Sequence, residues 1–330
     1  MIASASELVK PPSNTRVRAL RPAILLLLGT ALLVHLAIRA DPRQVFQALQ
    51  RAGGWLPLLA ALEALLLVTD TAAFAALIAS ARAIPARGWL RSSAVSYVCL
   101  VLLPAGRAVG EAARAALAAP YTGAKRAAIA GTELQAVALI ADGLVSLVAA
   151  VVIFCSLGSA QHLASALFGN CWLVALAGAA LLYLVRRPSA ASWVLEKAPR
   201  LARFLPRGAS GPAGSAWGAA AWSVLGRAIQ VLQYGIAVFA VGGAFSVRSA
   251  FVAHGVHMVG ATAGVAVPNQ VGIADGAYLV FAGVLGFGDA PARALAAMLA
   301  VRCAQLLLVI ACLSVVALLR EPSSTPSPVA

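Results

Sequence analysis

Long apolar runs recur along the whole chain, and short segments rich in arginine and lysine separate them. Six runs approach or exceed the length needed to cross a hydrocarbon core about 30 Å thick. These runs are residues 22–38, 55–81, 127–156, 168–185, 216–241 and 293–319. Two amphipathic stretches, residues 42–52 and 190–205, fit the membrane interface instead. The pattern predicts an all-α polytopic membrane protein with about six full spans.

Two further pairs of apolar segments are each joined by a stretch that contains proline and glycine. Residues 92–103 and 112–119 are too short to cross a membrane individually. If 92–119 were one span, the basic loop 186–207 would lie on the opposite side from the basic N-terminus, against the positive-inside rule. We therefore expect a re-entrant hairpin over 92–119. A second hairpin over 249–288 then enters from the other face, which is typical of an inverted repeat. Because 249–267 is long enough to span, the alternative for this region is a pair of full spans.

The composition agrees with a membrane protein and excludes several other classes. Hydrophobic residues make up 62% of the chain and charged residues 11%, whereas soluble domains average about 25% charged residues. The net charge is +14, but the basic residues lie between the apolar runs, so nucleic-acid binding is not expected. The five cysteines form no C-x-x-C pair, and no nucleotide or zinc motif is present. We expect no metal, no cofactor and no enzymatic activity.

The charge pattern also predicts the organisation of the chain in the membrane, with both termini in the cytoplasm. The predicted parts are a basic N-terminal segment (1–21), a first transmembrane half (22–185), a basic cytoplasmic loop with an amphipathic segment (186–215), a second transmembrane half (216–319) and a disordered tail (320–330). A basic start followed by 22–38 also fits a signal peptide, but the run is long and the following residues make a poor cleavage site, so an uncleaved anchor is favoured.

Charged residues inside the apolar segments are the main candidates for function. A charge at mid-bilayer costs about 2.5–3.5 kcal/mol on insertion scales, so these residues should pair or face a polar interior. Six of the eleven acids are placed in this way, together with four arginines. They are Glu63, Asp70, Glu111, Glu133, Asp142, Asp275, Arg107, Arg114, Arg227 and Arg302. The alternative to a functional site is a set of structural ion pairs that fixes helix packing.

Both predicted hairpin tips have the pattern proline, six residues, acid. The first runs from Pro104 to Glu111 and the second from Pro268 to Asp275. Each acid begins a short helix, and helix N-termini attract anions. With nearby arginines, such tips could cradle a phosphate. The alternative is that the arginines only pair with the acids of the tips. The pair His254 and His257 has metal-ligand spacing, but lacks a matching acid or cysteine, so interior histidines are expected.

The hairpin sequences resemble a known family. LLPAGRAVGEAARAALAA (102–119), and VPNQVGIADGAYLVFAGVLG (267–286) followed by Arg302, are similar to two elements of the lysylphosphatidylglycerol synthase transmembrane family. The resemblance implies a lipid flippase-like module, sometimes fused to an aminoacyl-transferase domain and in some stand-alone members associated with hopanoid biosynthesis. The positions of this chain that match the functional motifs of the family are Pro104, Gly110, Glu111, Arg114, Asp275 and Arg302.

The chain also departs from the family pattern. The second loop has Asn269 and Gln270 before Asp275, where the family more often has a glycine-rich loop and a glutamate. Glu133 is followed by leucine, where many relatives have arginine. The transferase domain is missing, so synthesis of lysyl-lipid is not expected.

Three functions remain open from the sequence. The first is a lipid translocator or lipid-binding transporter of the bacterial inner membrane that holds a polar or anionic headgroup. The second is an ion- or proton-coupled solute transporter that uses Glu63, Asp70 and Glu133 as relay sites, and the third is a scaffold for lipid-modifying enzymes. The expected substrate-binding set is Pro104, Arg107, Gly110, Glu111, Arg114, Glu133, Arg227, Asn269, Asp275 and Arg302. Expected partners are a membrane lipid (phospholipid, aminoacyl-lipid, polyprenyl or hopanoid), a second copy of the chain, or a lipid-biosynthesis enzyme.

Overall fold

The apolar runs form helices, and the described part of the chain contains no strand. The structure is a computed structural model and describes residues 15–78, 81–156, 161–187, 189 and 214–319. The helices are α1 (Thr15–Arg39), α2 (Pro42–Ala52), α3 (Leu56–Leu77), α4 (Ala86–Leu102), α5 (Gly106–Thr122), α6 (Ala124–Ser156), α7 (Gln161–Arg186), α9 (Ala216–Ala240), α10 (Val247–Ala263), α11 (Ile273–Val280) and α12 (Pro291–Leu318). The predicted all-α class is confirmed.

Five stretches are long and apolar enough to cross a membrane. They are Pro42–Leu77, which joins α2 to α3, and the helices α6, α7, α9 and α12. The run predicted over 22–38 lies in α1, whose apolar part Ala23–Arg39 is shorter than these five. A sixth full span through α1 therefore stays a prediction. The predicted amphipathic segment 190–205 and the tail 320–330 lie outside the described residues.

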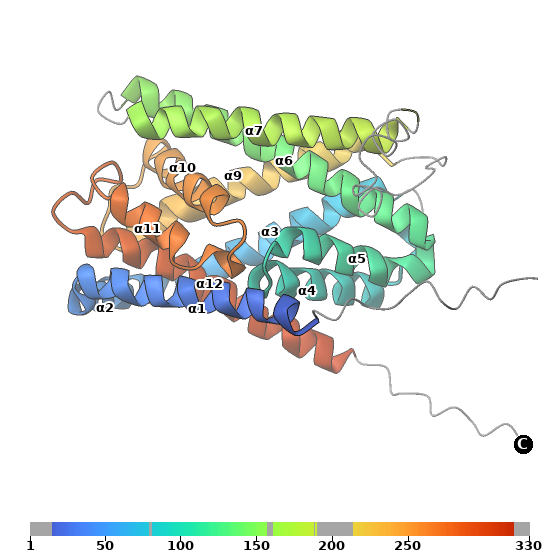
Figure 1. Ribbon diagram of the computed structural model, residues 1–330, viewed down its shortest axis with the longest axis horizontal. Helices are drawn as coiled ribbons and strands as arrows, with labels where there is room; N and C mark the ends of the chain where they lie inside the picture. Colours follow the sequence, from blue (N-terminus) through green and yellow to red (C-terminus); the bar gives the residue numbers. More distant parts are fainter. Residues whose placement is uncertain (1–14, 79–80, 157–160, 188, 190–213, 320–330) are drawn as a thin grey trace, which may run out of the picture.

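Two helical hairpins occupy the centre of the molecule. The turn between α4 and α5 lies at 103–105, and the turn between α10 and α11 includes the short 3-10 helix η6 (Pro268–Gln270). In Figure 1, α4 and α5 enter from the right-hand end, α10 and α11 enter from the left-hand end, and the two turns lie near the middle. The structure also brings α4 into contact with η6. The two tips therefore meet inside the helical bundle.

The hairpin boundaries differ from those expected. The arms of the first hairpin extend to Ala86 and Thr122, beyond the predicted range 92–119. The return arm of the second hairpin is shorter than the predicted segment 276–288, because α11 ends at Val280 and turns follow it. Glycines at 283, 286 and 288 explain this early end, since glycine disfavours a continued helix.

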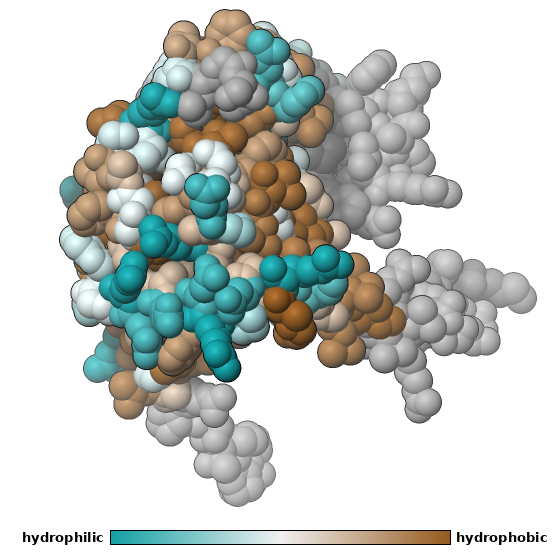
Figure 2. All heavy atoms as spheres, turned by 90° about the vertical axis from the view of Figure 1, so that its left-hand side faces the viewer, coloured by the Kyte–Doolittle hydropathy of each residue, from teal (hydrophilic) through white to brown (hydrophobic). Residues whose placement is uncertain are grey.

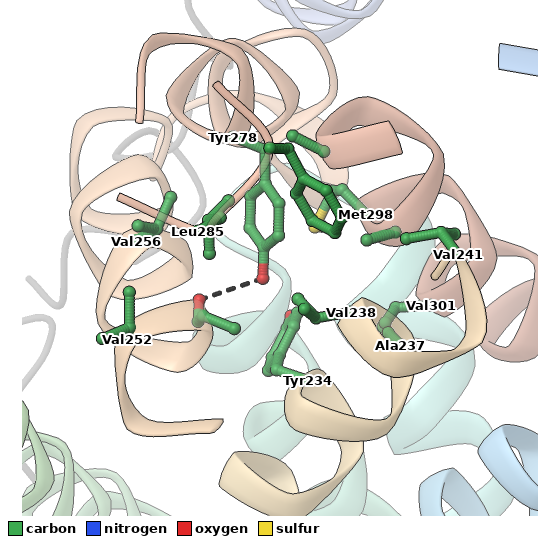
Figure 3. Close-up of a cluster of buried hydrophobic side chains, with 14 of the residues drawn as sticks. Tyr234, Ala237, Val238, Val241, Val252, Val256, Tyr278, Leu285, Met298 and Val301 are labelled. Atoms are coloured by element: carbon green, nitrogen blue, oxygen red, sulfur yellow. Dashed lines mark hydrogen bonds between the residues drawn. The ribbon is translucent and has the colours of Figure 1, made fainter. Parts of the chain in front are cut away.

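The second hairpin rests on a tightly packed core. Side chains from α9, α10, α11 and α12 converge there, and the Tyr278 hydroxyl donates a hydrogen bond of 2.9 Å to the Ala253 carbonyl (Figure 3). Gly260 lets α10 and α11 approach closely, because a Cβ atom at this position would lie 2.7 Å from the Ala274 Cα atom. Small residues at helix interfaces are typical of packing inside membranes.

Polar residues gather at the end of the molecule where α2 lies. Figure 2 views this end and shows a hydrophilic patch beside hydrophobic side chains. The amphipathic helix α2 contributes to it, with Val45, Ala48 and Ala52 buried and Arg43 and Arg51 exposed. This arrangement confirms the predicted amphipathic character of 42–52.

Candidate functional site

A cavity of about 430 Å³ lies between the two hairpin tips. Its volume is within the usual range for small-molecule sites. The lining comes from α3, α4, α5, α6, α7, α9, α10 and α12, and from both turns. Seven of the lining side chains are acids or arginines, namely Glu63, Asp70, Arg107, Glu111, Arg114, Asp142 and Arg227. A polar interior of this kind is what charged residues in apolar helices require.

The first tip brings the N-terminus of α5 to the cavity. Ala105 has a left-handed backbone (φ 50°) and turns the chain, after which Gly106 begins the helix. Gly110 sits where the two arms touch, and a Cβ atom there would lie 2.6 Å from the Ser96 carbonyl oxygen. Leu103, Ala105, Gly106 and Arg107 all line the cavity. Among the described residues, no side chain accepts a hydrogen bond from the N-terminal amides of α5. The first backbone N–H groups of this helix are therefore available to a ligand.

Asp70 on α3 is shared by two arginines of α5. Its carboxylate lies 2.7 Å from Arg114 Nη2 and 3.5 Å from Arg107 Nη2. The Arg114 side chain is 1% exposed, donates a hydrogen bond of 3.2 Å to the Asp70 carbonyl and lies 3.6 Å from Glu111 Oε1. The Arg114 guanidinium also lies over the Phe74 ring, 5.5 Å from its centroid. Arg114 is therefore largely occupied in holding the first hairpin on α3.

Arg107 is the least enclosed arginine of the cavity. Its side chain is 28% exposed, and its ionic contact within the described residues is the long one to Asp70. The Arg107 Nε atom is buried and has no hydrogen-bond partner among the described residues. Arg107 can therefore contact a ligand without first leaving a closely formed ion pair.

Arg227 on α9 forms an ion pair with Asp142 on α6 and donates a hydrogen bond of 2.6 Å to Gln230 on its own helix. All three residues line the cavity. The pairing explains how α6 carries two acids on different faces: Asp142 meets α9, while Glu133 meets Arg186 of α7 at 2.8 Å. Helix α6 therefore has an arginine partner on each of two neighbouring helices.

Arg302 on α12 holds the second tip. Its Nε and Nη2 atoms bind the two oxygens of Asp275 at 2.8 and 2.9 Å. Its Nη1 and Nη2 atoms donate to the carbonyls of Asn269 and Gln270 at 2.8 and 3.4 Å. Both of these tip residues have left-handed backbones, with φ of 46° and 52°. Arg302 thus fixes a turn that ordinary residues adopt at a cost in energy.

The N-terminus of α11 differs from that of α5, because its own acid caps it. Asp275 Oδ2 accepts a hydrogen bond of 2.7 Å from the Gly272 amide. Gly272 has φ 81°, a conformation that suits glycine. The expected anion-attracting helix end is therefore occupied at the second tip and open at the first.

The structure brings together only part of the predicted binding set. Arg107, Glu111, Arg114, Arg227 and Asn269 line the cavity. Pro104 and Gly110 lie in the first hairpin. Asp275 and Arg302 bind each other beside the second tip, and neither lines the cavity. Glu133 does not line the cavity. The sequence left open that the arginines only pair with the acids of the tips. The structure contains such ion pairs between Glu111 and Arg114 and between Asp275 and Arg302.

Sequence reasoning missed two polar residues that contact Glu63. The Tyr97 hydroxyl donates to Glu63 Oε1 at 2.9 Å, and Gln233 Nε2 donates to Glu63 Oε2 at 2.7 Å. Gln233 lies in the apolar run 216–241, three residues after Gln230, and this repeated spacing was the signal available. Tyr97 carried no such signal, because tyrosine is common in membrane helices.

The histidine pair is buried, as expected for interior histidines. His254 and His257 are 0% and 8% exposed, and His257 stacks on Tyr234 with ring centroids 4.4 Å apart. The described residues contain no group of three or more potential metal ligands.

Residues 22–312 match the family described as "Lysylphosphatidylglycerol synthase TM region". Neither the curated proteins nor the solved structures gave a match. The family match includes both hairpins, the cavity and every residue of the predicted binding set. The chain belongs to the lysylphosphatidylglycerol synthase transmembrane family, and the family resemblance of its hairpin motifs is confirmed.

Proposed function

We propose that the protein translocates a membrane lipid and that the cavity between the hairpin tips holds the lipid headgroup. The family is associated with lipid translocation. The observation that carries the proposal is the mouth of the cavity. Leu100, Leu103, Trp222 and Val265 line the cavity and are each more than a third exposed. Such a mouth suits a lipid, whose headgroup enters the polar cavity while its chains stay against apolar surface.

In the proposed arrangement the two hairpins are re-entrant and belong to inverted halves of the bundle. A turn at membrane depth requires that its backbone groups be buried in protein or line a wet cavity. Both turns lie against the cavity described above. The mouth also favours lipid over a soluble solute, because an aqueous route would place polar side chains at its opening.

Within the cavity we assign Arg107 and the N-terminus of α5 to the headgroup. A guanidinium and free backbone N–H groups both bind phosphate oxygens well. Arg107 is partly exposed to the cavity, whereas Arg114 and Arg302 are enclosed by acids and carbonyls. The enclosed arginines then position the tips, and Arg107 contacts the ligand.

A vesicle assay tests the function. The purified protein is reconstituted into vesicles that contain NBD-labelled phosphatidylglycerol, and dithionite quenching reports movement of the probe between leaflets. We expect faster movement than in protein-free vesicles. Equal rates in protein-containing and protein-free vesicles, also with labelled phosphatidylethanolamine, would contradict translocation.

A variant pair tests the assignment of Arg107. Arg107→Gln should slow movement of labelled phosphatidylglycerol at least fivefold, because it removes the ionic contact to the phosphate. Arg87→Gln changes an exposed arginine in the first turn of α4 and should move the probe at the wild-type rate. If both variants match the wild type, Arg107 does not bind the headgroup, although the protein still translocates lipid.

A further inference from the structure

Glu63 differs from the other buried acids of the bundle. Asp70, Glu111, Glu133, Asp142 and Asp275 each lie within ion-pair distance of an arginine. Glu63 is 5% exposed and lines the cavity, yet no lysine, arginine or histidine nitrogen of the described chain lies within 4.0 Å of it. A buried carboxylate without a cation is costly, and a proton is the simplest way to remove its charge.

The charged residues that line the cavity balance only when Glu63 is neutral. Four acids line it, Glu63, Asp70, Glu111 and Asp142, against three arginines, Arg107, Arg114 and Arg227. The three arginines are engaged with the other three acids. An ionised Glu63 therefore leaves one unbalanced negative charge in the cavity, and a protonated Glu63 leaves the charges even.

The hydrogen bonds around Glu63 accommodate both protonation states. The amide of Gln233 has a fixed orientation, because its Nε2 atom also donates to the Leu59 carbonyl at 3.2 Å, and a carbonyl only accepts. Glu63 Oε2 therefore always accepts from Gln233. On the other side, the Tyr97 hydroxyl can rotate, so it donates to an ionised Oε1 and accepts from a protonated one. A proton can bind at Oε1 without any change in the positions of heavy atoms.

The titratable and charged groups near Glu63 line the same cavity or lie beside Tyr97 or Tyr234. They are Asp70 on α3, Tyr97 on α4, Arg107, Glu111 and Arg114 on α5, Asp142 on α6, Arg227 and Tyr234 on α9, His257 on α10, and Arg302 and Cys312 on α12. The arginines among them have acidic partners. The side chains that hydrogen-bond to Glu63, from Tyr97, Gln233 and Gln305 of α12, are all neutral.

We propose that Glu63 is a proton-binding site of the cavity and that its charge controls the affinity for an anionic headgroup. The reaction is the addition of one proton from water to Oε1, which converts the carboxylate into a carboxylic acid. The neutral form removes the repulsion of an anion, so low pH favours binding of an anionic lipid. The control of affinity rests on the proposed headgroup site, whereas proton binding at Glu63 does not.

The first test reads the proton directly and needs no translocation. Infrared difference spectra of the protein in nanodiscs, between pH 5 and pH 9, should contain a carboxylic-acid C=O band in the wild type that is absent from Glu63→Gln. Glutamine preserves the shape and can accept from Gln233 and donate to Tyr97, so this variant should fold. Asp289→Asn changes an exposed acid in a loop and should keep the band. Identical wild-type and Glu63→Gln difference spectra would overturn the proposal.

Tyr97→Phe tests the assigned oxygen. Loss of the hydroxyl removes the acceptor of the hydrogen bond that the protonated Oε1 donates, so the C=O band should move to higher frequency. A band at the wild-type frequency in Tyr97→Phe would contradict the assignment of the proton to that oxygen.

The second test measures binding with short-chain lipids. Dioctanoyl phosphatidylglycerol should raise the melting temperature of the wild type more at pH 6 than at pH 8, and equally at both pH values in Glu63→Gln. Zwitterionic dioctanoyl phosphatidylcholine should show no such dependence. Equal stabilisation by phosphatidylglycerol at both pH values in the wild type would overturn the control of affinity. A protein that binds as expected but does not move labelled lipid would contradict only translocation.

Discussion

Arg302 and Asp275 form two parallel hydrogen bonds, from Nε to Oδ1 at 2.8 Å and from Nη2 to Oδ2 at 2.9 Å. The remaining donors of Arg302 reach the carbonyls of the second tip, where two consecutive residues have left-handed backbones. A single planar guanidinium thus connects α12, the N-terminus of α11 and the turn beside the cavity. A point charge cannot make these contacts at the same time.

Arg302→Lys should therefore destabilise the protein although it keeps the charge. The variant loses the second bond to Asp275 and at least one carbonyl contact, and bonds to charged groups are worth about 1.5–3 kcal/mol each. Thermal unfolding in detergent should show a lower melting temperature. The matched control is Arg186→Lys, because Arg186 pairs with Glu133 but its side chain is 37% exposed. If both variants unfold at the same temperature, Arg302 does not stabilise the tip in this way.

Gly110→Ala tests the close contact between the arms of the first hairpin. The added methyl group would lie 2.6 Å from the Ser96 carbonyl oxygen, so α4 and α5 must separate. Overpacking of this kind costs about 1–3 kcal/mol. Gly169→Ala is the control, since Gly169 is a helical glycine with no atom within 4 Å of an added Cβ. Thermal unfolding should separate the two variants, and a stable Gly110→Ala protein would contradict the contact.

Local spacing predicted much of the site but not its long-range pairs. The pairing of arginines with the acids of the tips was one of the two alternatives that the sequence left open, and the structure contains the pairs Glu111 with Arg114 and Asp275 with Arg302. By contrast, Asp70 and Arg114 are far apart in the chain, and their pairing depends on how α5 packs against α3. The same holds for Glu133 and Arg186 on neighbouring helices. Periodicity gives the face of one helix and says nothing about which helix lies opposite.

The roles of the arginines illustrate the same limit. The sequence placed Arg107, Arg114 and Arg302 together among the residues expected to hold a headgroup and did not rank them. The structure places Arg302 behind the second tip and encloses Arg114 between two acids and an aromatic ring. Arg107 stands out only when side-chain exposure is known. Exposure depends on the whole fold, so no local pattern could have ranked these residues.

A double-mutant cycle should distinguish the two arginines that share Asp70. The contact to Arg114 is short and buried, whereas the contact to Arg107 is 3.5 Å long and partly exposed. Combining Asp70→Asn with Arg114→Gln should give a coupling energy of about 1–3 kcal/mol. The cycle with Arg107→Gln should give less than about 1 kcal/mol. Thermal unfolding of the single and double variants supplies both values, and equal couplings would contradict the different roles assigned to these arginines.

The orientation in the membrane follows from the charges at the two ends of the bundle and is testable by cysteine labelling. In Figure 1 the junctions between α3 and α4 and between α5 and α6 lie at the same end of the bundle as the end of α7. These segments carry Arg82, Arg87, Lys125 and Arg186, whereas α2 and the loop before α12, at the opposite end, carry charges of both signs. The positive-inside rule therefore predicts that the start of α6 is in the cytoplasm and the loop before α12 outside. Cys155 is exposed and is first replaced by alanine so that it does not react. In this background, Gly288→Cys should react with a membrane-impermeant maleimide in right-side-out vesicles. Position 288 is exposed, and a Cβ atom added there meets no atom within 4 Å. Lys125→Cys, also at an exposed position, should react only after permeabilisation. The reverse pattern would invert the orientation, and labelling of both sites before permeabilisation would contradict the assignment of the two ends to opposite sides.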